Sequence, residues 1–468
     1  MTLTQIFIFA GLGLAAGRFY EHISRGWLLF TASVLAVFWL QPASLVRSLP
    51  FLLPVASLGL AFLVWALTQP KDYKANRRDQ WAAGLLGGLT LLVGAARYID
   101  PLSSLLASRP PQIDVVAGTL LFIFVFALIA YKLGRWQGLA LHAAVLFIIL
   151  ILVVLKSGPL ATNVSGFLRS LTGQDPTLAG AFDFGWLGFS YIAFRLIHTL
   201  RDRVSGRLPP ISLRDFVTYI VFFPGLTAGP IDRVERFQPQ LQTEFILGNA
   251  QLLAAGRRLV IGFFLKFVLA DGLAFFALNA TNAWQVQTAG WAWVLLIAYA
   301  FRIFFDFAGY THIAIGLGLL FGVLLPENFD RPYLKPNLTA FWNSWHITLA
   351  QWFRAYYFNP LTRWLRTRQV QVWLIILIGQ LSTMALIGLW HGITLNFLAW
   401  GLWHGTGLFA HNLWAQFCKA RNLTIDERIA GPLGVATTFL YVSLGWVWFA
   451  LPAPEDAGRL FSLLFGLQ

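Results

Sequence analysis

The sequence predicts an all-α integral membrane protein that crosses the bilayer many times. Only 12% of its 468 residues are charged and 57% are hydrophobic, whereas a soluble domain carries about 25% charged residues. Long stretches without a single charge recur along the chain, and a membrane-crossing helix needs about 20 mostly apolar residues. This composition excludes a soluble, collagen-like or disordered protein.

The hydrophobic segments can be followed in order along the chain. Stretches of 20 or more residues without Asp, Glu, Lys or Arg cover 26–46, 48–70, 136–155, 272–301, 307–326, 369–418 and 429–454. Shorter or interrupted candidates lie at 2–17, 80–96, 115–131, 178–200, 216–231 and 258–280. The stretch 369–418 is long enough for two spans joined by a tight turn. We therefore expect about 11 to 14 hydrophobic segments, some of them re-entrant.

The charges that do occur are mostly basic and gather in short loops. The 34 Lys and Arg against 20 Asp and Glu give a formal net charge of +14. In a soluble protein this surplus would suggest nucleic acid, but in a membrane protein it is typical of loops that face the cytoplasm. We place three basic stretches there: 71–78, 195–214 and 354–368. The expected location is the cytoplasmic membrane, with many crossings and no nucleic-acid partner.

Two further features of the chain restrict the possibilities. Residues 1–17 lack a basic region ahead of the apolar run, so the first segment is expected to be retained rather than cleaved as a signal peptide. The polar connections near 156–177 and 232–250 are too short to hold a separate catalytic domain. We therefore expect one membrane-embedded domain over 1–468, with any chemistry inside it.

Polar residues concentrate in the second half of the chain. Residues 1–160 read as scaffold helices, whereas five of the eight histidines fall between 312 and 411. Ionisable groups at membrane depth are costly, and they usually line a cavity or mark a site. The histidine spacings fit no zinc motif and the single cysteine, Cys418, lies apart from any ligand set, so no metal is expected.

The segment 338–360 holds one of these histidines among aromatic residues. If it formed one helix, His346 would share a face with Trp342, Leu349 and Phe353. Its Trp and Tyr content is typical of an interfacial helix. Spacing alone leaves two interpretations open: His346 packs beneath an aromatic belt, or it points into a catalytic cavity.

The tripeptide Trp-His-Gly occurs twice, centred on His391 and His404. The turn inside 369–418 is expected between or near them. The two histidines are 13 residues apart, about 220° around an ideal helix, so they would not share a face. Gly388 and Gly392 flank His391, and glycine lets a backbone or substrate approach closely. His391 is therefore the better catalytic candidate, and His404 a packing or orienting residue.

A histidine in a dry cavity suits acyl transfer to a hydroxyl. Neutral imidazole can take the proton of a hydroxyl as its oxygen attacks an acyl carbonyl, acting as a general base. The sequence contains no GxSxG nucleophile elbow. Direct transfer from donor to acceptor is then simpler than a mechanism with a covalent enzyme intermediate.

Four blocks of sequence resemble one family in the same order. They are FFPGLTAGPIDRVERFQPQL (222–241), FFDFAGYTHIAIGLGLLFGVLLPENFDRPYL (304–334), TAFWNSWHITLAQWFRAYYFNPL (339–361) and GLWHGITLNFLAWGLWHG (388–405). These blocks resemble the membrane-bound O-acyltransferases, in the bacterial branch of alginate O-acetyltransferases and teichoic-acid D-alanyl transfer proteins. The resemblance covers about 185–450.

The resemblance implies a fold and a site. The family's fold is one helical body with re-entrant or horizontal helices around a central funnel, and the Gly229-Pro230 turn and 326–329 look like parts of that funnel. By resemblance His391 is the catalytic histidine and His346 its partner. Four neighbours complete the candidate site as substrate-binding residues: Trp342, Asn343, Trp390 and Asn396.

The chain departs from the family pattern at two acidic positions. Where relatives commonly read Gly-Tyr-Ser-Asp this chain ends the motif with His312, and where they commonly read Trp-Phe-Arg-Asp it ends with Ala355. Losing two acidic groups near the site could retune the acceptor or carrier preference, or accompany a loss of activity.

The sequence leaves three functions to compare. The first is transfer of an acetyl or similar small acyl group from a cytoplasmic thioester towards an envelope polysaccharide. The donor would be a coenzyme A ester or an acyl group on a carrier protein's phosphopantetheine, and no tightly bound cofactor is expected. The acceptor would be reached directly or through an extracytoplasmic acyltransferase. The second is D-alanyl transfer to teichoic acids with a carrier protein. Segment 449–466 favours the first and 229–233 the second. The third, a transporter, predicts repeated halves, which the sequence lacks.

Overall fold

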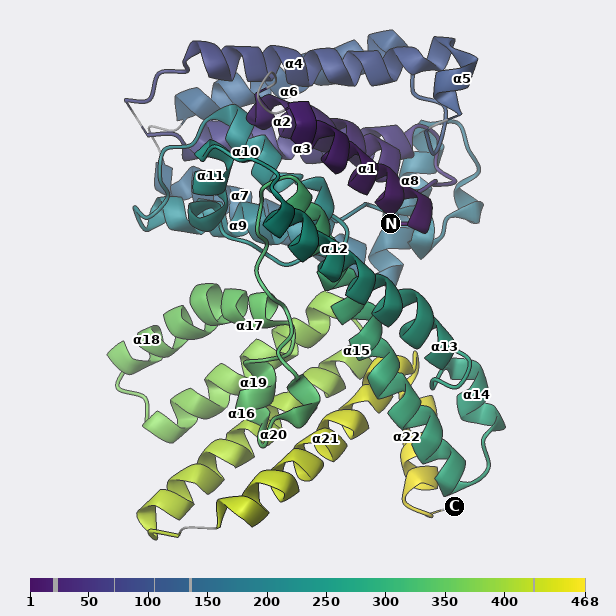
Figure 1. Ribbon diagram of the computed structural model, residues 1–468, viewed down its shortest axis with the longest axis vertical. Coiled ribbons are helices and arrows are strands. Elements are labelled where there is room, and N and C mark those ends of the chain that lie inside the picture. Colours follow the sequence, from purple (N-terminus) through teal and green to yellow (C-terminus); the bar gives the residue numbers. More distant parts are fainter. Residues whose placement is uncertain (20–23, 71, 105, 134–136, 424–425, 468) are drawn as a thin grey trace. The chain divides into compact units, whose positions relative to one another are not determined.

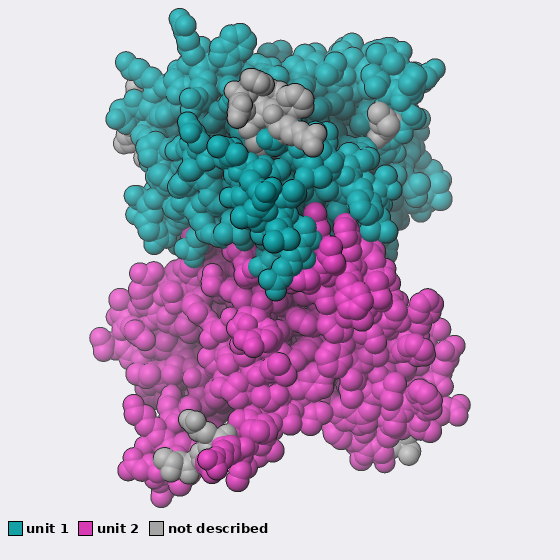
Figure 2. All heavy atoms as spheres, in the orientation of Figure 1, with its two compact units in different colours: residues 1–258, 313–325 teal, residues 259–312, 326–468 magenta. Residues whose placement is uncertain are grey.

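The computed structural model describes residues 1–19, 24–70, 72–104, 106–133, 137–423 and 426–467. The described residues are overwhelmingly helical, and their only strand-like pairing is an isolated antiparallel bridge between Phe329 and Trp345. The chain forms two compact units, residues 1–258 with 313–325 and residues 259–312 with 326–468 (Figure 2). The division falls inside two helices, α12 (Asn249–Phe263) and α15 (Ala289–Leu320).

The first unit is built from the amino-terminal helices, drawn from purple to teal in Figure 1. Helix α3 packs against α6 and α9, and α7 packs against α8 and α9. The elements of this unit that precede α12 are α1 (Leu3–Phe19), α2 (Arg25–Leu40), α3 (Leu49–Thr68), α4 (Arg77–Ala95), η1 (Ala96–Tyr98), α5 (Asp100–Ser103), α6 (Ile113–Leu133), α7 (Gln137–Lys156), α8 (Gly158–Leu171), η3 (Pro176–Leu178), η4 (Ala181–Asp183), α9 (Phe189–Val204), α10 (Leu213–Ile220), η5 (Phe223–Gly225) and α11 (Val234–Gln242).

The second unit holds the carboxy-terminal helices, and α19, α20 and α21 lie side by side within it (Figure 1). Its elements, besides its parts of α12 and α15, are the π-helical η6 (Phe264–Ala270), α13 (Asp271–Leu273), α14 (Ala280–Gln285), η7 (Pro332–Leu334), α16 (Leu338–Trp342), α17 (Ile347–Phe353), the π-helical η8 (Arg354–Phe358), α18 (Asn359–Thr367), α19 (Val372–His391), α20 (Leu395–Ala420), α21 (Glu427–Ala450) and α22 (Pro454–Leu464).

Six of the described helices are long and apolar enough to cross a membrane, which confirms the membrane class. They are α3, α6, α7, α15, α19 and α21, and the apolar helices α1 and α2 are somewhat shorter. In α6 and α7 fewer than a fifth of the residues in the most apolar window are buried by protein. Apolar side chains left uncovered along a whole helix suit contact with lipid.

Three stretches differ from the sequence-based expectation. The segments 272–301 and 307–326 share one continuous helix, the 32-residue α15. The segment 156–177, expected as a polar connection, contains helix α8. The stretch 216–231 forms the end of the short α10, the η5 turn and irregular chain instead of a span.

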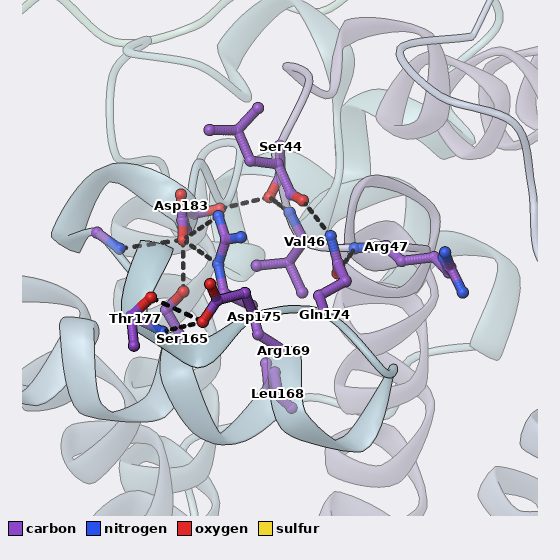
Figure 3. A network of polar contacts seen from close by, with 12 residues as sticks. Ser44, Val46, Arg47, Ser165, Leu168, Arg169, Gln174, Asp175, Thr177 and Asp183 are labelled. Atoms are coloured by element: carbon purple, nitrogen blue, oxygen red, sulfur yellow. Dashed lines mark hydrogen bonds and ion pairs between the residues drawn. The ribbon is translucent and has the colours of Figure 1, made fainter.

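A buried ion pair explains why the polar segment 156–177 folds. The guanidinium of Arg169 donates to the Asp183 carboxylate at 3.0 and 3.1 Å, and both side chains are buried. Ser165 and the Gly180 amide donate to the same carboxylate, and Ser44 donates to the Asp183 carbonyl (Figure 3). Because every charge is paired, α8 can pack against η4 without an uncompensated buried group.

Glycines set the spacing between α19 and α20. A β-carbon added at Gly388 would overlap the Phe397 carbonyl, and one added at Gly401 would overlap the Met384 carbonyl. At Gly405 it would come within 3.0 Å of the Leu381 backbone. The two helices therefore approach backbone to backbone, as small residues allow in membrane proteins.

The π-helical segment η6 is fixed to α15 in a similar way. A β-carbon added at Gly309 would lie 2.7 Å from the Lys266 amide nitrogen. The Lys266 ammonium reaches the Asp306 carboxylate at 2.5 Å. The ion pair neutralises the charge of Asp306, which precedes Phe307 on α15.

Candidate functional site

His346 lies at a break between two helices. The helix expected over 338–360 is interrupted, because His346 adopts a left-handed conformation with φ 41° between α16 and α17. The prediction of a single helix is therefore wrong, although Trp342, His346 and Leu349 do come together. A left-handed backbone at a non-glycine residue costs about 1 to 3 kcal/mol and persists only where its surroundings enforce it.

Asn328 supplies that enforcement. Its backbone carbonyl accepts from the Ile347 amide at 3.0 Å, and its side-chain oxygen accepts from the Thr348 hydroxyl at 2.7 Å and the Thr348 amide at 3.3 Å. The bridge between Phe329 and Trp345 holds the other side of the turn. Asn328 is fully buried, so this clamp fixes where the His346 side chain points.

His391 is the last residue of α19. The chain turns through Gly392 and restarts at Leu395, where the Thr394 side chain caps α20 by accepting from the Phe397 amide. The turn expected between the two Trp-His-Gly motifs is therefore confirmed. His391 is half-buried at this helix end.

The two histidines line one small cavity inside the second unit. Its volume is about 110 Å³. Phe307 packs edge-on against His346 with ring centroids 4.7 Å apart, and Phe449 packs edge-on against His391 at 4.8 Å. The lining residues are Ile303, Phe307, Trp342, Trp345, His346, Leu349, Ile387, His391, Trp400, Trp446 and Phe449. None of them is Asp, Glu, Lys or Arg.

His346 presents a neutral imidazole to this cavity. The residue is only 3% exposed, and within the described part of the chain neither ring nitrogen has a hydrogen-bond partner. It lies outside the six candidate spans, and burial lowers its pKa because the charged form loses its hydration. A neutral imidazole keeps one nitrogen lone pair available to accept a proton or a hydrogen bond.

The four predicted substrate-binding residues take different places. Trp342 lines the cavity, and Trp390 lies outside the lining with its ring 4.6 Å from that of His391 and 6.3 Å from that of His346. Asn343 is exposed and accepts from Arg354 at 2.5 Å. Asn396 is buried and donates to the Leu451 carbonyl at 2.7 Å. The cavity thus brings together His346, His391 and Trp342, and the two asparagines lie away from its lining.

The second Trp-His-Gly histidine is a packing residue, as expected. His404 is fully buried, and its ring contacts Trp342 and Trp400, whose rings line the cavity, with centroids 5.2 and 5.0 Å apart. It is absent from the cavity lining. His404 therefore packs against the Trp342 and Trp400 rings and helps to fix their positions in the cavity lining.

Sequence reasoning missed the cavity residues contributed by α15 and α21. Trp446 and Phe449 stand three residues apart on α21, and Ile303 and Phe307 stand four apart on α15. Those spacings put each pair on one helix face. The signal was present, but an apolar face in a membrane protein is also typical of contact with lipid.

A cluster of side chains of the kinds that can bind a metal lies in the first unit. His198, Asp202 and Glu235 place ligand atoms within 4.8 Å of one another. Arg207 donates to Asp202 at 2.6 Å, and Arg233 adds positive charge near His198. Because Arg207 already neutralises the Asp202 carboxylate, we interpret this cluster as part of an ion-pair network.

Comparison with known proteins agrees with this architecture. The family model described as the membrane-bound O-acyltransferase family matches residues 115–451. A probable alginate O-acetylase of Pseudomonas fluorescens is 34% identical over 289 residues, 60% of this chain and 54% of the relative. A peptidoglycan O-acetyltransferase of Helicobacter pylori is 33% identical over 292 residues, 58% of this chain and 52% of the relative.

A teichoic acid D-alanyltransferase of Streptococcus thermophilus is 31% identical over 306 residues, 60% of this chain and 72% of the relative. The chain spans about half the length of the alginate and peptidoglycan relatives. The family match covers well over half of the chain and includes every residue of the cavity. The chain therefore belongs to the membrane-bound O-acyltransferase family.

Proposed function

We propose that the protein is an O-acyltransferase that moves an acetyl or similar small acyl group from a thioester to a hydroxyl destined for a cell-envelope polysaccharide. The observation that supports this most is the cavity itself. Two histidines from separate helices line one apolar space of about 110 Å³. Such a space suits a group of a few heavy atoms and excludes bulk water, which would otherwise hydrolyse the thioester.

The proposed reaction is a direct transfer. The hydroxyl oxygen of the acceptor attacks the thioester carbonyl carbon, and His391 takes the hydroxyl proton as general base. The carbon–sulfur bond breaks as the carbon–oxygen bond forms, and the leaving thiolate receives the proton from the imidazolium. His346, which is neutral and fixed by Asn328, would donate a hydrogen bond to the developing oxyanion.

The cavity lining favours an uncharged acyl group over D-alanyl. A D-alanyl group carries an ammonium at neutral pH, and burying that charge without a partner is costly. Among the eleven lining residues no carboxylate is present to pair with it. We therefore propose acetyl as the first acyl group to test and D-alanyl as the alternative.

The donor and partners follow from the same proposal. A coenzyme A ester or an acyl group on a carrier protein's phosphopantetheine would approach from the cytoplasm, where the basic loops attract a negatively charged donor. The acceptor is an envelope polysaccharide or an extracytoplasmic acyltransferase that completes the transfer. The protein would lie in the cytoplasmic membrane, and no tightly bound cofactor is required.

Replacement of the histidines tests the proposal. His391→Ala should lower polysaccharide ester content by about 100-fold or more, because a general base contributes about that much. His346→Ala should also lower it. His411→Ala is the matched control, since His411 belongs to α20 but not to the cavity lining. The measurement is mass analysis of esters released from surface polymers, at equal protein levels.

The same measurement separates the alternatives. Loss of acetyl esters supports the first proposal, and loss of D-alanyl esters supports the second. Unchanged esters of both kinds in cells that hold normal amounts of the His391→Ala protein would refute acyl transfer at this cavity.

A further inference from the structure

A large apolar groove lies in the first unit, away from the histidine cavity. Its volume is about 640 Å³, and it is lined by residues of α3, α4 and α6 with Leu213 of α10. Apart from a few groups at one end and Thr90, the lining is aliphatic and aromatic. The acyl-transfer proposal makes no use of it.

Two glycines of α4 keep the groove open. A β-carbon added at Gly84 or Gly87 would meet no heavy atom within 4 Å, and both residues line the groove. By contrast, a β-carbon at Gly59 of α3 would lie 2.9 Å from Ile123 of α6. Helix α3 thus packs tightly on α6 at this point, whereas the part of α4 around Gly84 and Gly87 leaves open space beside it.

One end of the groove is polar. Tyr131 donates to the Tyr73 carbonyl, and Tyr73 donates to the Asp79 carboxylate at 2.6 Å. The other Asp79 oxygen accepts from the Leu213 amide at 2.9 Å. Asp79 is buried and held in place by these donors, and its single negative charge is outnumbered by the exposed cations at the same end.

Exposed cations surround the same end. Lys74, Arg77 and Arg78 flank the lining residues Ala75 and Asp79 in sequence, and Lys132 follows the lining residue Tyr131; all four cations are exposed. The other acidic group of the loop, Asp72, is attracted to Arg203. The groove therefore pairs an apolar space with a basic rim.

We propose that this groove binds an anionic phospholipid, with an acyl chain along the space lined by α3, α4 and α6 and the phosphate at Arg77, Arg78 and Lys74. Helices α3 and α6 are candidate spans, so the apolar space faces the hydrocarbon region where acyl chains are the available occupant. Basic groups at the end of such a space select lipids with negative headgroups. Neither the histidines nor the acyl donor takes part.

The test uses the full-length protein equilibrated in mixed micelles with equal amounts of phosphatidylglycerol and phosphatidylcholine. Native mass spectrometry then counts the lipids that stay bound. Wild type should retain phosphatidylglycerol preferentially. In Arg77→Gln/Arg78→Gln the preference should fall about 5-fold for each charge removed. Removing positive charge from the first turn of α4 does not weaken the helix, so unfolding would not explain the loss.

A second variant tests the proposed binding site for the acyl chain of the lipid. Gly84→Leu/Gly87→Leu should fill the groove and abolish retention of both lipids, and leucine stabilises a helix relative to glycine. Gly88→Leu is the matched control, because Gly88 has equally open surroundings but does not line the groove. Equal retention of both lipids by wild type, or identical retention by the Gly84/Gly87 and Gly88 variants, would overturn the proposal.

Discussion

His346 combines a strained backbone with a buried, neutral ring, and this combination makes a prediction at the scale of one residue. Glycine adopts φ near 41° without steric cost, whereas alanine does not. His346→Gly should therefore be more stable than His346→Ala, by about 1 kcal/mol, although both variants lose the imidazole. Thermal unfolding of the two purified proteins measures the difference.

The ester-transfer activity of the His346→Gly and His346→Ala variants provides the control. Both variants should lose ester transfer, and added imidazole should restore part of it in His346→Gly, where the space of the missing side chain is larger. If the alanine variant were the more stable of the two, the left-handed turn would not be a feature of the folded protein.

Sequence alone could not show this turn. The residue spacing in 338–360 fits one helix. The break at His346 depends on Asn328, which lies 18 residues before His346 and accepts a hydrogen bond from Thr348. The sequence singles out His346 and His391 because histidines are rare in apolar segments, and their role in catalysis stays a prediction. Their meeting in one cavity with Phe307 and Phe449 depends on tertiary packing.

At the scale of elements, the hairpin of α19 and α20 depends on glycines that permit backbone contact. Gly388→Ala should push α20 away, because its methyl group would overlap the Phe397 carbonyl. Overpacking of this kind costs about 1 to 3 kcal/mol, and the shift would also move His391, three residues later. We expect a lower unfolding temperature and reduced ester transfer.

Gly431→Ala is the matched control for this change. Gly431 lies in α21, and a β-carbon there would meet no heavy atom within 4 Å. Alanine favours a helix over glycine by about 1 kcal/mol, so this variant should be as stable as wild type or more stable. Equal unfolding temperatures for the Gly388 and Gly431 variants would contradict close backbone packing at Gly388.

Helix positions were largely predictable, and their lengths less so. Charge-free stretches located α2, α3, α7, α19, α20 and α21 to within a few residues at most of their ends. The two stretches joined in α15 were separated in sequence by Arg302 and Asp306, both of which lie within the continuous helix, and Asp306 pairs there with Lys266. Counting the charges in a segment does not show ion pairs between residues that are far apart in sequence.

At the scale of the whole molecule, the distribution of basic loops predicts how the chain is oriented in the bilayer. Short segments rich in Lys and Arg stay in the cytoplasm. The stretch 72–78 leads into α4, but 195–214 covers most of α9 and the start of α10, with Arg195 and Arg214 buried, and 354–368 forms η8 and α18 instead of a loop. The remaining cations of all three stretches should face the cytoplasm. Helix α3 is a candidate span. Leu45, which precedes α3 and is 75% exposed, should therefore face the opposite side from Lys74.

Cysteine labelling measures this orientation, because Cys418 is the only native thiol. In a Cys418→Ser background, a membrane-impermeant maleimide added to intact spheroplasts should label Leu45→Cys but not Lys74→Cys, Arg203→Cys or Arg366→Cys. All four should react after the membrane is opened. Labelling of Lys74→Cys in intact spheroplasts would reverse the predicted orientation, and it would place the basic rim of the groove on the side away from the cytoplasmic thioester donor.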